Sequence, residues 1–135
     1  MISKVVYKGD LRTEASHLQS GETIITDAPV DNEGKGEAFS PTDLLATALA
    51  SCMLTIMGIV AKRDGIDMEG ATAEVEKIMA SNQRRIGEIR LKINFVHPIT
   101  DKDQAKLERA AHTCPVSKSL HTDLTESIEF IYPNP

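Results

Sequence analysis

One stretch decides the fold of this chain: SPTDLLATALASC, residues 40–52. Its first residue, Ser40, is a favoured helix N-cap, and Pro41 suits the first helical position because its missing N–H needs no partner there. The carboxylate of Asp43 can accept hydrogen bonds from the free amides of a first turn. The stretch therefore predicts that a helix starts at Ser40.

The predicted helix is long and apolar on all sides. No charged residue occurs from Leu44 to Ala61, and Lys62 and Arg63 then bring positive charge to the negative end of the helix dipole. Such a helix is surrounded either by protein or by lipid, and its length just reaches the transmembrane range. Because alanine, threonine and glycine dilute its hydrophobicity, we expect a central helix of a soluble domain, with no membrane. One face of this helix is expected to pack on a sheet. A second subunit is the simplest partner for its opposite face.

The sequence before this helix predicts three short strands. Val5 and Tyr7 alternate with lysines, and residues 11–18 and 22–26 follow, with turn signals between them. Residues 28–39 are rich in proline, glycine and acidic residues, which indicates a loop long enough to suspect a function.

The sequence after the helix returns to strands and then to helices. In order, it predicts a hairpin of strands at 73–78 and 89–95, a helix from Thr100, a short helix from Pro115 to Leu120 and a last strand at 124–132. Strands and helices are grouped and do not alternate one by one. The fold class is therefore α+β, and residues 1–135 are expected to form a single domain.

Composition narrows the function. The chain has 135 residues and a net charge of −5, and its basic residues are scattered. Nucleic-acid binding is not expected, because it needs a concentrated basic face. The first residues lack the unbroken apolar run of a signal peptide, so a cytoplasmic location is expected. In a reducing compartment, two cysteines indicate reactive or buried thiols and not a structural framework.

The two cysteines differ in their local surroundings. Cys52 lies in mid-helix, where a free cysteine is often only a small buried hydrophobe, and no residue near it in sequence favours the thiolate. Cys114 directly precedes Pro115 at a predicted helix start, where the dipole and free amides favour thiolate. Local physics thus ranks Cys114 as the more acidic thiol, although a cap without chemistry remains an alternative. Neither a Cys-x-x-Cys motif nor zinc-ligand spacing is present.

Two motifs together resemble the OsmC/Ohr family, the osmotically inducible protein C-like and organic hydroperoxide resistance proteins. Residues 40–52 resemble the family's central-helix motif, and CPVSKSL at 114–120 resembles its second motif. The resemblance implies an OsmC-like fold, with antiparallel or mixed sheets around a long central helix. It also implies an intertwined homodimer with active sites at the subunit interface.

The resemblance implies a thiol-dependent reduction of organic hydroperoxides. Cys52 would be the peroxidatic thiol and Cys114 the resolving one, and a dithiol reductant would open the resulting disulfide. Neither a cofactor nor a metal would be needed. The family also activates its first thiol with an arginine from the N-terminal strands and a carboxylate near the helix start. Arg12 is the candidate arginine, and Asp43 or Glu37 the candidate carboxylate.

The sequence departs from the Ohr branch at one position and leaves alternatives open. In that branch a glutamate directly follows the proline, where this chain has Thr42, so the general OsmC-like branch is the nearer resemblance. The expected apolar substrate pocket at the dimer interface is lined by Leu44, Leu45, Met53 and Ile56. The alternative functions are a non-catalytic dimer that binds an apolar or thiol-containing small molecule, and a redox sensor.

Overall fold

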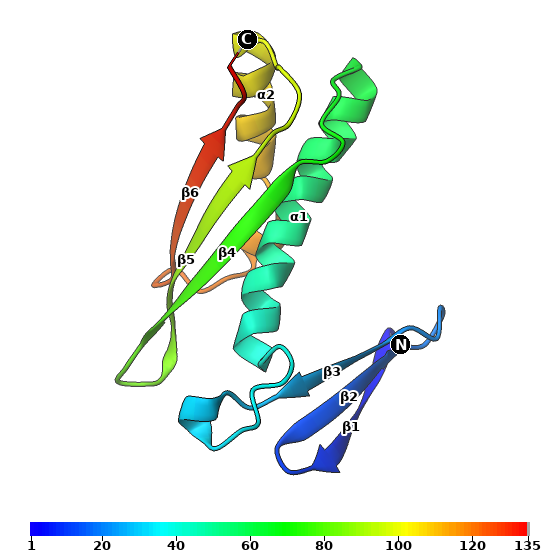
Figure 1. Cartoon of the computed structure of the whole chain (residues 1–135), viewed down its shortest axis with the longest axis vertical. Coiled ribbons are helices and arrows are strands. Elements are labelled where there is room, and N and C mark those ends of the chain that lie inside the picture. Colours follow the sequence, from blue (N-terminus) through cyan, green and yellow to red (C-terminus); the bar gives the residue numbers. More distant parts are fainter. Residues whose placement is uncertain (135) are drawn as a thin grey trace. The chain divides into compact units, whose positions relative to one another are not determined.

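The computed structural model describes residues 1–134 in two compact units, residues 1–45 and a second unit that begins at Ala46 (Figure 1). Two three-stranded sheets and a long helix confirm the α+β class. The elements are β1 (Ser3–Gly9), β2 (Arg12–His17), β3 (Thr23–Asp27), a 3₁₀ turn η1 (Val30–Asn32), α1 (Pro41–Asp64), β4 (Thr72–Ala80), β5 (Arg85–Asn94), α2 (Asp101–Ala111), α3 (Pro115–Lys118) and β6 (Thr125–Ile131).

The first unit is an antiparallel sheet in the order β1-β2-β3. Within residues 1–45 no apolar side chain is buried; the buried residues there are Thr26, Asp27 and Ser40. Large apolar side chains on these strands are exposed, and they include Val5, Val6, Tyr7, Ile24 and Ile25. A sheet needs an apolar face packed against another layer to be stable. The first unit therefore has no core of its own.

The loop between β3 and α1 folds back on β3. Backbone N–H groups of Gly34 and Gly36 donate to Pro29 (2.9 Å) and Ala28 (3.2 Å). Gly34 lies so close to the Ala28 backbone that a Cβ atom there would overlap it. The expected loop at 28–39 is thus an ordered segment, and it requires glycine at position 34.

The helix α1 starts where the sequence predicts. Ser40 Oγ accepts the N–H of Asp43 at 3.0 Å, and the Asp43 carboxylate accepts the N–H of Ser40 at 3.0 Å. This reciprocal arrangement satisfies two free amides at once, as in a capping box. At the other end Gly65 has a positive φ of 70°, and the Ile66 N–H donates to the Ala61 carbonyl at 2.8 Å. The uncharged run therefore forms one continuous helix between two local signals.

The second unit packs a mixed sheet against helices. Its strand order is β4-β5-β6, in which β4 and β5 form an antiparallel hairpin and β6 runs parallel to β5. In Figure 1 α1 runs along this sheet. The fully buried side chains from α1, β5 and α2 form one cluster, and they include Leu49, Met53, Ile89, Ile93 and Leu107.

One side of α1 belongs to the core of the second unit. By length and composition it could cross a membrane, and one third of its most apolar window is buried within the protein. The core helix of a soluble protein meets the same criteria. The buried residues of α1 repeat at helical spacing, so one side of the helix faces the core. They include Ala46, Leu49, Met53, Met57 and Ala61.

Leu107→Ala tests this core. Leu107 is 0% exposed, so its truncation leaves a cavity, and we expect the free energy of unfolding to fall by about 2–5 kcal/mol. The exposed Lys102 on the same helix is the matched control, and Lys102→Ala should change the free energy by less than about 0.5 kcal/mol. Urea unfolding followed by circular dichroism at one protein concentration measures both. Equal effects would contradict the packing of α2 described above.

Candidate active site

The two thiols lie in the same unit. Cys52 is half-buried midway along α1, and Cys114 is fully buried in the core cluster against which Cys52 packs. Neither forms a disulfide. The Cys52 side chain lies close enough to Cys114 to contribute to the raised pKa of the Cys114 thiol. Two cysteines that are 62 positions apart in sequence are thus brought together by the fold.

Cys114 occupies the turn between α2 and α3. It lies beyond the last residue of α2, Ala111, and is the N-cap residue of α3. Its Sγ atom accepts the backbone N–H of Ser117 at 3.5 Å. The position at a helix start is the one that the sequence predicts, although α3 ends at Lys118, before Leu120.

The acidity expected of Cys114 from its sequence is wrong. Burial of the thiol raises its pKa above the ordinary value, and the hydrogen bond to the Cys52 side chain raises it further. The backbone amides of Ser117 and Val116 act in the opposite direction and are outweighed. Burial penalises the charged form of a thiol, and a hydrogen bond donated by the S–H stabilises the neutral form. Burial therefore favours the neutral, protonated form of the Cys114 thiol.

Arg12 is part of an ion-pair network in the first unit. It lies on β2 directly opposite Asp27 on β3, and its Nε and Nη2 atoms donate to the two Asp27 carboxylate oxygens at 2.7 Å and 2.8 Å. Asp27 also accepts the backbone N–H of Glu37 at 3.1 Å, and the Glu37 carboxylate lies 3.7 Å from Arg12 Nη2. The structure thus brings together two of the predicted residues, Arg12 and Glu37, around an aspartate.

Sequence reasoning missed Asp27. Its side chain is 1% exposed, and the hydrogen bond from Arg12 is the main cause that lowers its pKa, while that of Arg12 is raised by the same contact. An acidic residue at the end of a short strand, with an arginine at the start of the neighbouring strand, was the available signal. It becomes specific only when the strand register is known.

Asp43 has a structural role at the start of α1, in the capping contacts with Ser40. It also lines a shallow hollow of the first unit together with Glu37 and apolar side chains; the lining residues are Ile24, Ile25, Gly36, Glu37, Ala38, Phe39 and Asp43. Both candidate carboxylates thus border the same hollow. Which of them serves Cys52 stays a prediction.

The four residues predicted to bind substrate differ in burial. Leu45 is exposed, Leu44 and Ile56 are half-buried, and Met53 is part of the core of the second unit. Their role in a substrate pocket stays a prediction.

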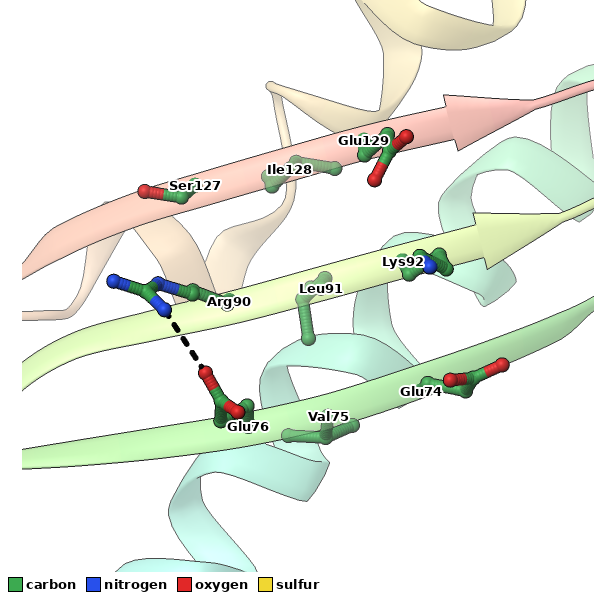
Figure 2. A pocket seen from close by; sticks show the side chains of 9 residues that line it. All are labelled: Glu74, Val75, Glu76, Arg90, Leu91, Lys92, Ser127, Ile128 and Glu129. Carbon is green, nitrogen blue, oxygen red and sulfur yellow. Dashed lines mark hydrogen bonds and ion pairs between the residues drawn. The ribbon is translucent and has the colours of Figure 1, made fainter.

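A separate groove lies on the face of the second sheet that bears its charged side chains (Figure 2). Two polar rows cross the three strands there, Glu76–Arg90–Ser127 and Glu74–Lys92–Glu129. Arg90 Nη1 donates to Glu76 at 3.2 Å. The groove is lined by neither cysteine and by none of the other predicted site residues. Charged cross-strand pairs of this kind are typical of a solvated sheet face.

Comparison with known proteins shows the family to which this chain belongs. The sequence profile of the family described as OsmC-like protein matches residues 34–129. The chain belongs to the OsmC-like family. The matched region contains Asp43, both cysteines and the whole of α1, and it runs across the boundary between the two units.

Solved structures agree with this membership. A crystal structure from Psychrobacter arcticus, provisionally described as an osmotic stress induced and detoxification response protein, is 58% identical, with a TM-score of 0.94 over 96% of this chain and 95% of that chain. An OsmC-like protein from Mycoplasma pneumoniae shares the fold at 18% identity (TM-score 0.81; 98% and 96% covered). So does an organic hydroperoxide resistance protein from Legionella pneumophila at 19% identity (TM-score 0.73; 96% and 95% covered). No curated protein matches the chain.

Arg12→Met tests the ion pair with Asp27. In the native protein the lowered pKa of Asp27 adds stability above the ordinary carboxyl range, and this stability is lost as the pH falls through the lowered value. Without Arg12, burial raises the pKa of Asp27. The charged carboxylate then lowers the free energy of unfolding at neutral pH, and its protonation at lower pH removes this loss. We therefore expect the stability gap between native protein and variant to narrow from about pH 7 to about pH 4.

Urea unfolding at both pH values and at one protein concentration measures the gap. Arg90→Met is the matched control, because it removes an exposed arginine that also pairs with carboxylates, and its effect should be smaller at neutral pH. A gap for Arg12→Met that widens on acidification would contradict the assignment.

Proposed function

We propose that this protein reduces organic hydroperoxides, with Cys52 as the attacking thiol and Cys114 as the resolving thiol. The observation that carries the proposal is the packing of the half-buried Cys52 against the core cluster that contains the fully buried Cys114. The half-buried Cys52 is the more accessible of the two sulfurs, and the thiolate is the form of a cysteine that attacks a peroxide. Structural relatives named organic hydroperoxide resistance proteins support the same chemistry.

In the first step the Cys52 thiolate attacks the terminal oxygen of the hydroperoxide. A sulfur–oxygen bond forms and the oxygen–oxygen bond breaks, and the alkoxide takes a proton from solvent and leaves as an alcohol. The sulfur loses two electrons and becomes a sulfenic acid, while the peroxide is reduced.

In the second step Cys114 attacks the Cys52 sulfur. A sulfur–sulfur bond forms, the sulfur–oxygen bond breaks, and the proton released by Cys114 leaves with the hydroxyl group as water. A dithiol reductant then exchanges with the disulfide and returns both thiols. The electrons pass through sulfur alone, so neither a cofactor nor a metal enters the cycle.

Arg12 is the proposed activator of Cys52, and Glu37 or Asp43 orients it. The pair with Asp27 uses the Nε and Nη2 edge of the guanidinium, so the Nη1 donors lie outside that pair. A guanidinium that is fixed along one edge keeps its remaining donors in a constant direction. The Nη1 donors of Arg12 are the ones that we propose reach Cys52 in the assembled protein.

A homodimer is the proposed assembly, and the cytoplasm the proposed location. The first unit buries no apolar side chain, and on α1 Leu45 and Ile59 are exposed by 41% and 59%. Apolar surface of this extent is typical of an interface between subunits. We propose that each subunit is one continuous 135-residue domain. The partner subunit would then cover the exposed apolar side chains of the first unit and of α1.

Cysteine variants test the reaction. With cumene hydroperoxide as substrate and dithiothreitol as reductant, we expect Cys52→Ser to abolish turnover, because the attacking sulfur is missing. Cys114→Ser should still consume one equivalent of peroxide and accumulate sulfenic acid on Cys52, which intact-mass spectrometry detects after trapping. Turnover that is indifferent to Cys52→Ser would refute the mechanism and favour a binding module.

Arg12→Lys tests the proposed activation. Lysine keeps the positive charge but not the edge contact with Asp27, so we expect the first step to slow by about tenfold, since a charge-assisted hydrogen bond contributes about 1.5–3 kcal/mol. Rapid-quench measurement of Cys52 oxidation gives this rate. Arg85→Lys, on an arginine that donates to backbone carbonyls of a turn, is the control and should leave the rate unchanged.

Sedimentation equilibrium tests the assembly. We expect the native protein to have twice the mass of the chain at micromolar concentration and Ile59→Glu to shift it toward the monomer, because a charge at a buried apolar contact is unfavourable. Lys102→Glu, which changes charge on α2, is the control. A native protein that is monomeric and active at these concentrations would rule out the dimer.

A further inference from the structure

Glu126 breaks the pattern of the strand that carries it. Side chains of β6 alternate: Ser127 and Glu129 are exposed, whereas Ile128 and Phe130 are half-buried and pack against the core. Glu126 belongs to the half-buried row, and in register it lies beside Ile89, which is fully buried. An apolar residue is expected at this position of a half-buried strand. A carboxylate here therefore requires a specific partner.

The partner is Ser117 in α3. Its hydroxyl lies 2.9 Å from one carboxylate oxygen of Glu126 and 2.8 Å from the other, so it donates to the carboxylate. Within residues 1–134, no lysine, arginine or histidine is placed within ion-pair distance of Glu126. The hydroxyl of Ser117 is thus the polar group that compensates the partial burial of this charge.

Ser117 connects Glu126 to the thiol pair. Its backbone N–H donates to Cys114 Sγ at 3.5 Å, while its hydroxyl donates to Glu126. The Cys114 thiol in turn interacts with Cys52. A chain of contacts therefore runs from β6 through α3 to α1.

The first turn of α3 needs such an anchor. The helix has four residues, and one isolated turn is unstable in water because it fixes several dihedral angles for a single hydrogen bond. A second hydroxyl group of this turn, that of Ser119, donates to the Pro115 carbonyl, and this bond is internal to the turn. The bond from Ser117 to Glu126 instead fixes the turn to the sheet.

We propose that Glu126 is a positioning residue for Cys114. Through the hydroxyl of Ser117 it holds the first turn of α3, so that the Ser117 amide stays on Cys114 Sγ while this sulfur attacks Cys52. This inference rests on the proposed function for the role of Cys114. The anchored amide stabilises the negative charge on sulfur that the second step requires, and it has no part in the attack of Cys52 on the peroxide.

The role predicts an effect that is confined to one step. Glu126→Ala and Ser117→Ala should each slow disulfide formation by about tenfold, the size expected for the loss of one hydrogen bond to a charged group. Both should also displace the pH profile of that step to higher pH, because burial still disfavours the Cys114 thiolate and the opposing amide is gone. The rate of Cys52 oxidation by cumene hydroperoxide should stay as in the native protein.

Rapid-quench mass spectrometry separates the steps by following sulfenic acid and disulfide over a pH series. The double variant should be no slower than either single variant, since both remove the same bond. Glu126→Gln keeps an acceptor for the Ser117 hydroxyl and should restore the rate. Glu129→Ala on the exposed row and Ser119→Ala on α3 are matched controls and should react as the native protein does.

Two results would overturn the inference. One is a native rate of disulfide formation in Ser117→Ala, a variant that leaves only a small change at a half-buried position and needs no refolding of β6. The other is a Glu126→Gln variant as slow as Glu126→Ala, which would assign the effect to the charge and not to the bond.

A second assay distinguishes failure of this inference from failure of the proposed function. Glutathione disulfide places glutathione on Cys52 without any peroxide, and Cys114 then displaces it, so that one sulfur–sulfur bond forms as another breaks and glutathione leaves as its thiol. The same order of rates among the variants is expected. If peroxide does not oxidise Cys52 but this order holds, the proposed reaction fails and the positioning role stands; if the order is absent, the role fails.

Discussion

The burial of Cys114 is the constraint on which the proposed chemistry depends. A thiol that loses all contact with water is held in its neutral form, and the amides at the start of α3 do not compensate for this loss. Cys52, in contrast, is half-buried, and in the proposed reaction it is the sulfur that meets the substrate. The order of the two thiols in the proposed reaction thus follows from their difference in exposure.

The same helix that presents Cys52 also forms the core. Leu49 and Met53 flank Cys52 on α1 and are fully buried, so the position of the sulfur is fixed by close packing and not by a flexible loop. Cys114, in contrast, lies in a short turn that local structure alone does not hold. The placement of this pair is therefore only as accurate as the anchoring of that turn.

The first unit has the opposite character, with little apolar burial and an ordered polar network. Arg12 is surrounded by two carboxylates, Asp27 and Glu37, so the group as a whole carries no net positive charge. The charge of such an arginine is already balanced by the carboxylates. It would therefore bind an anion mainly through its directed N–H donors. Directed donors of this kind are what the proposed activation of a thiolate by Arg12 would use.

Much of the fold could be predicted because its signals are local. Ser40 and Asp43, which cap each other, predict the start of α1. The alternation of apolar and polar residues predicts the strands. The raised pKa of Cys114 could not be predicted, since the decisive factors are burial and the nearby Cys52 side chain. Asp27 was missed for a similar reason: its partner lies across a strand pair whose register the sequence does not state.

Glu126 shows how a departure from local pattern can point to function. A leucine at this position would continue the row of Ile128 and Phe130 and would bury more apolar surface. It would also leave the Ser117 hydroxyl without its acceptor, and the turn that carries Cys114 without its bond to the sheet. Sequences agree with their fold at most positions, and the exceptions tend to lie at sites of function. At residue 126 apolar burial is lower than the strand pattern allows, and the carboxylate found there is bonded to the turn that holds the second sulfur.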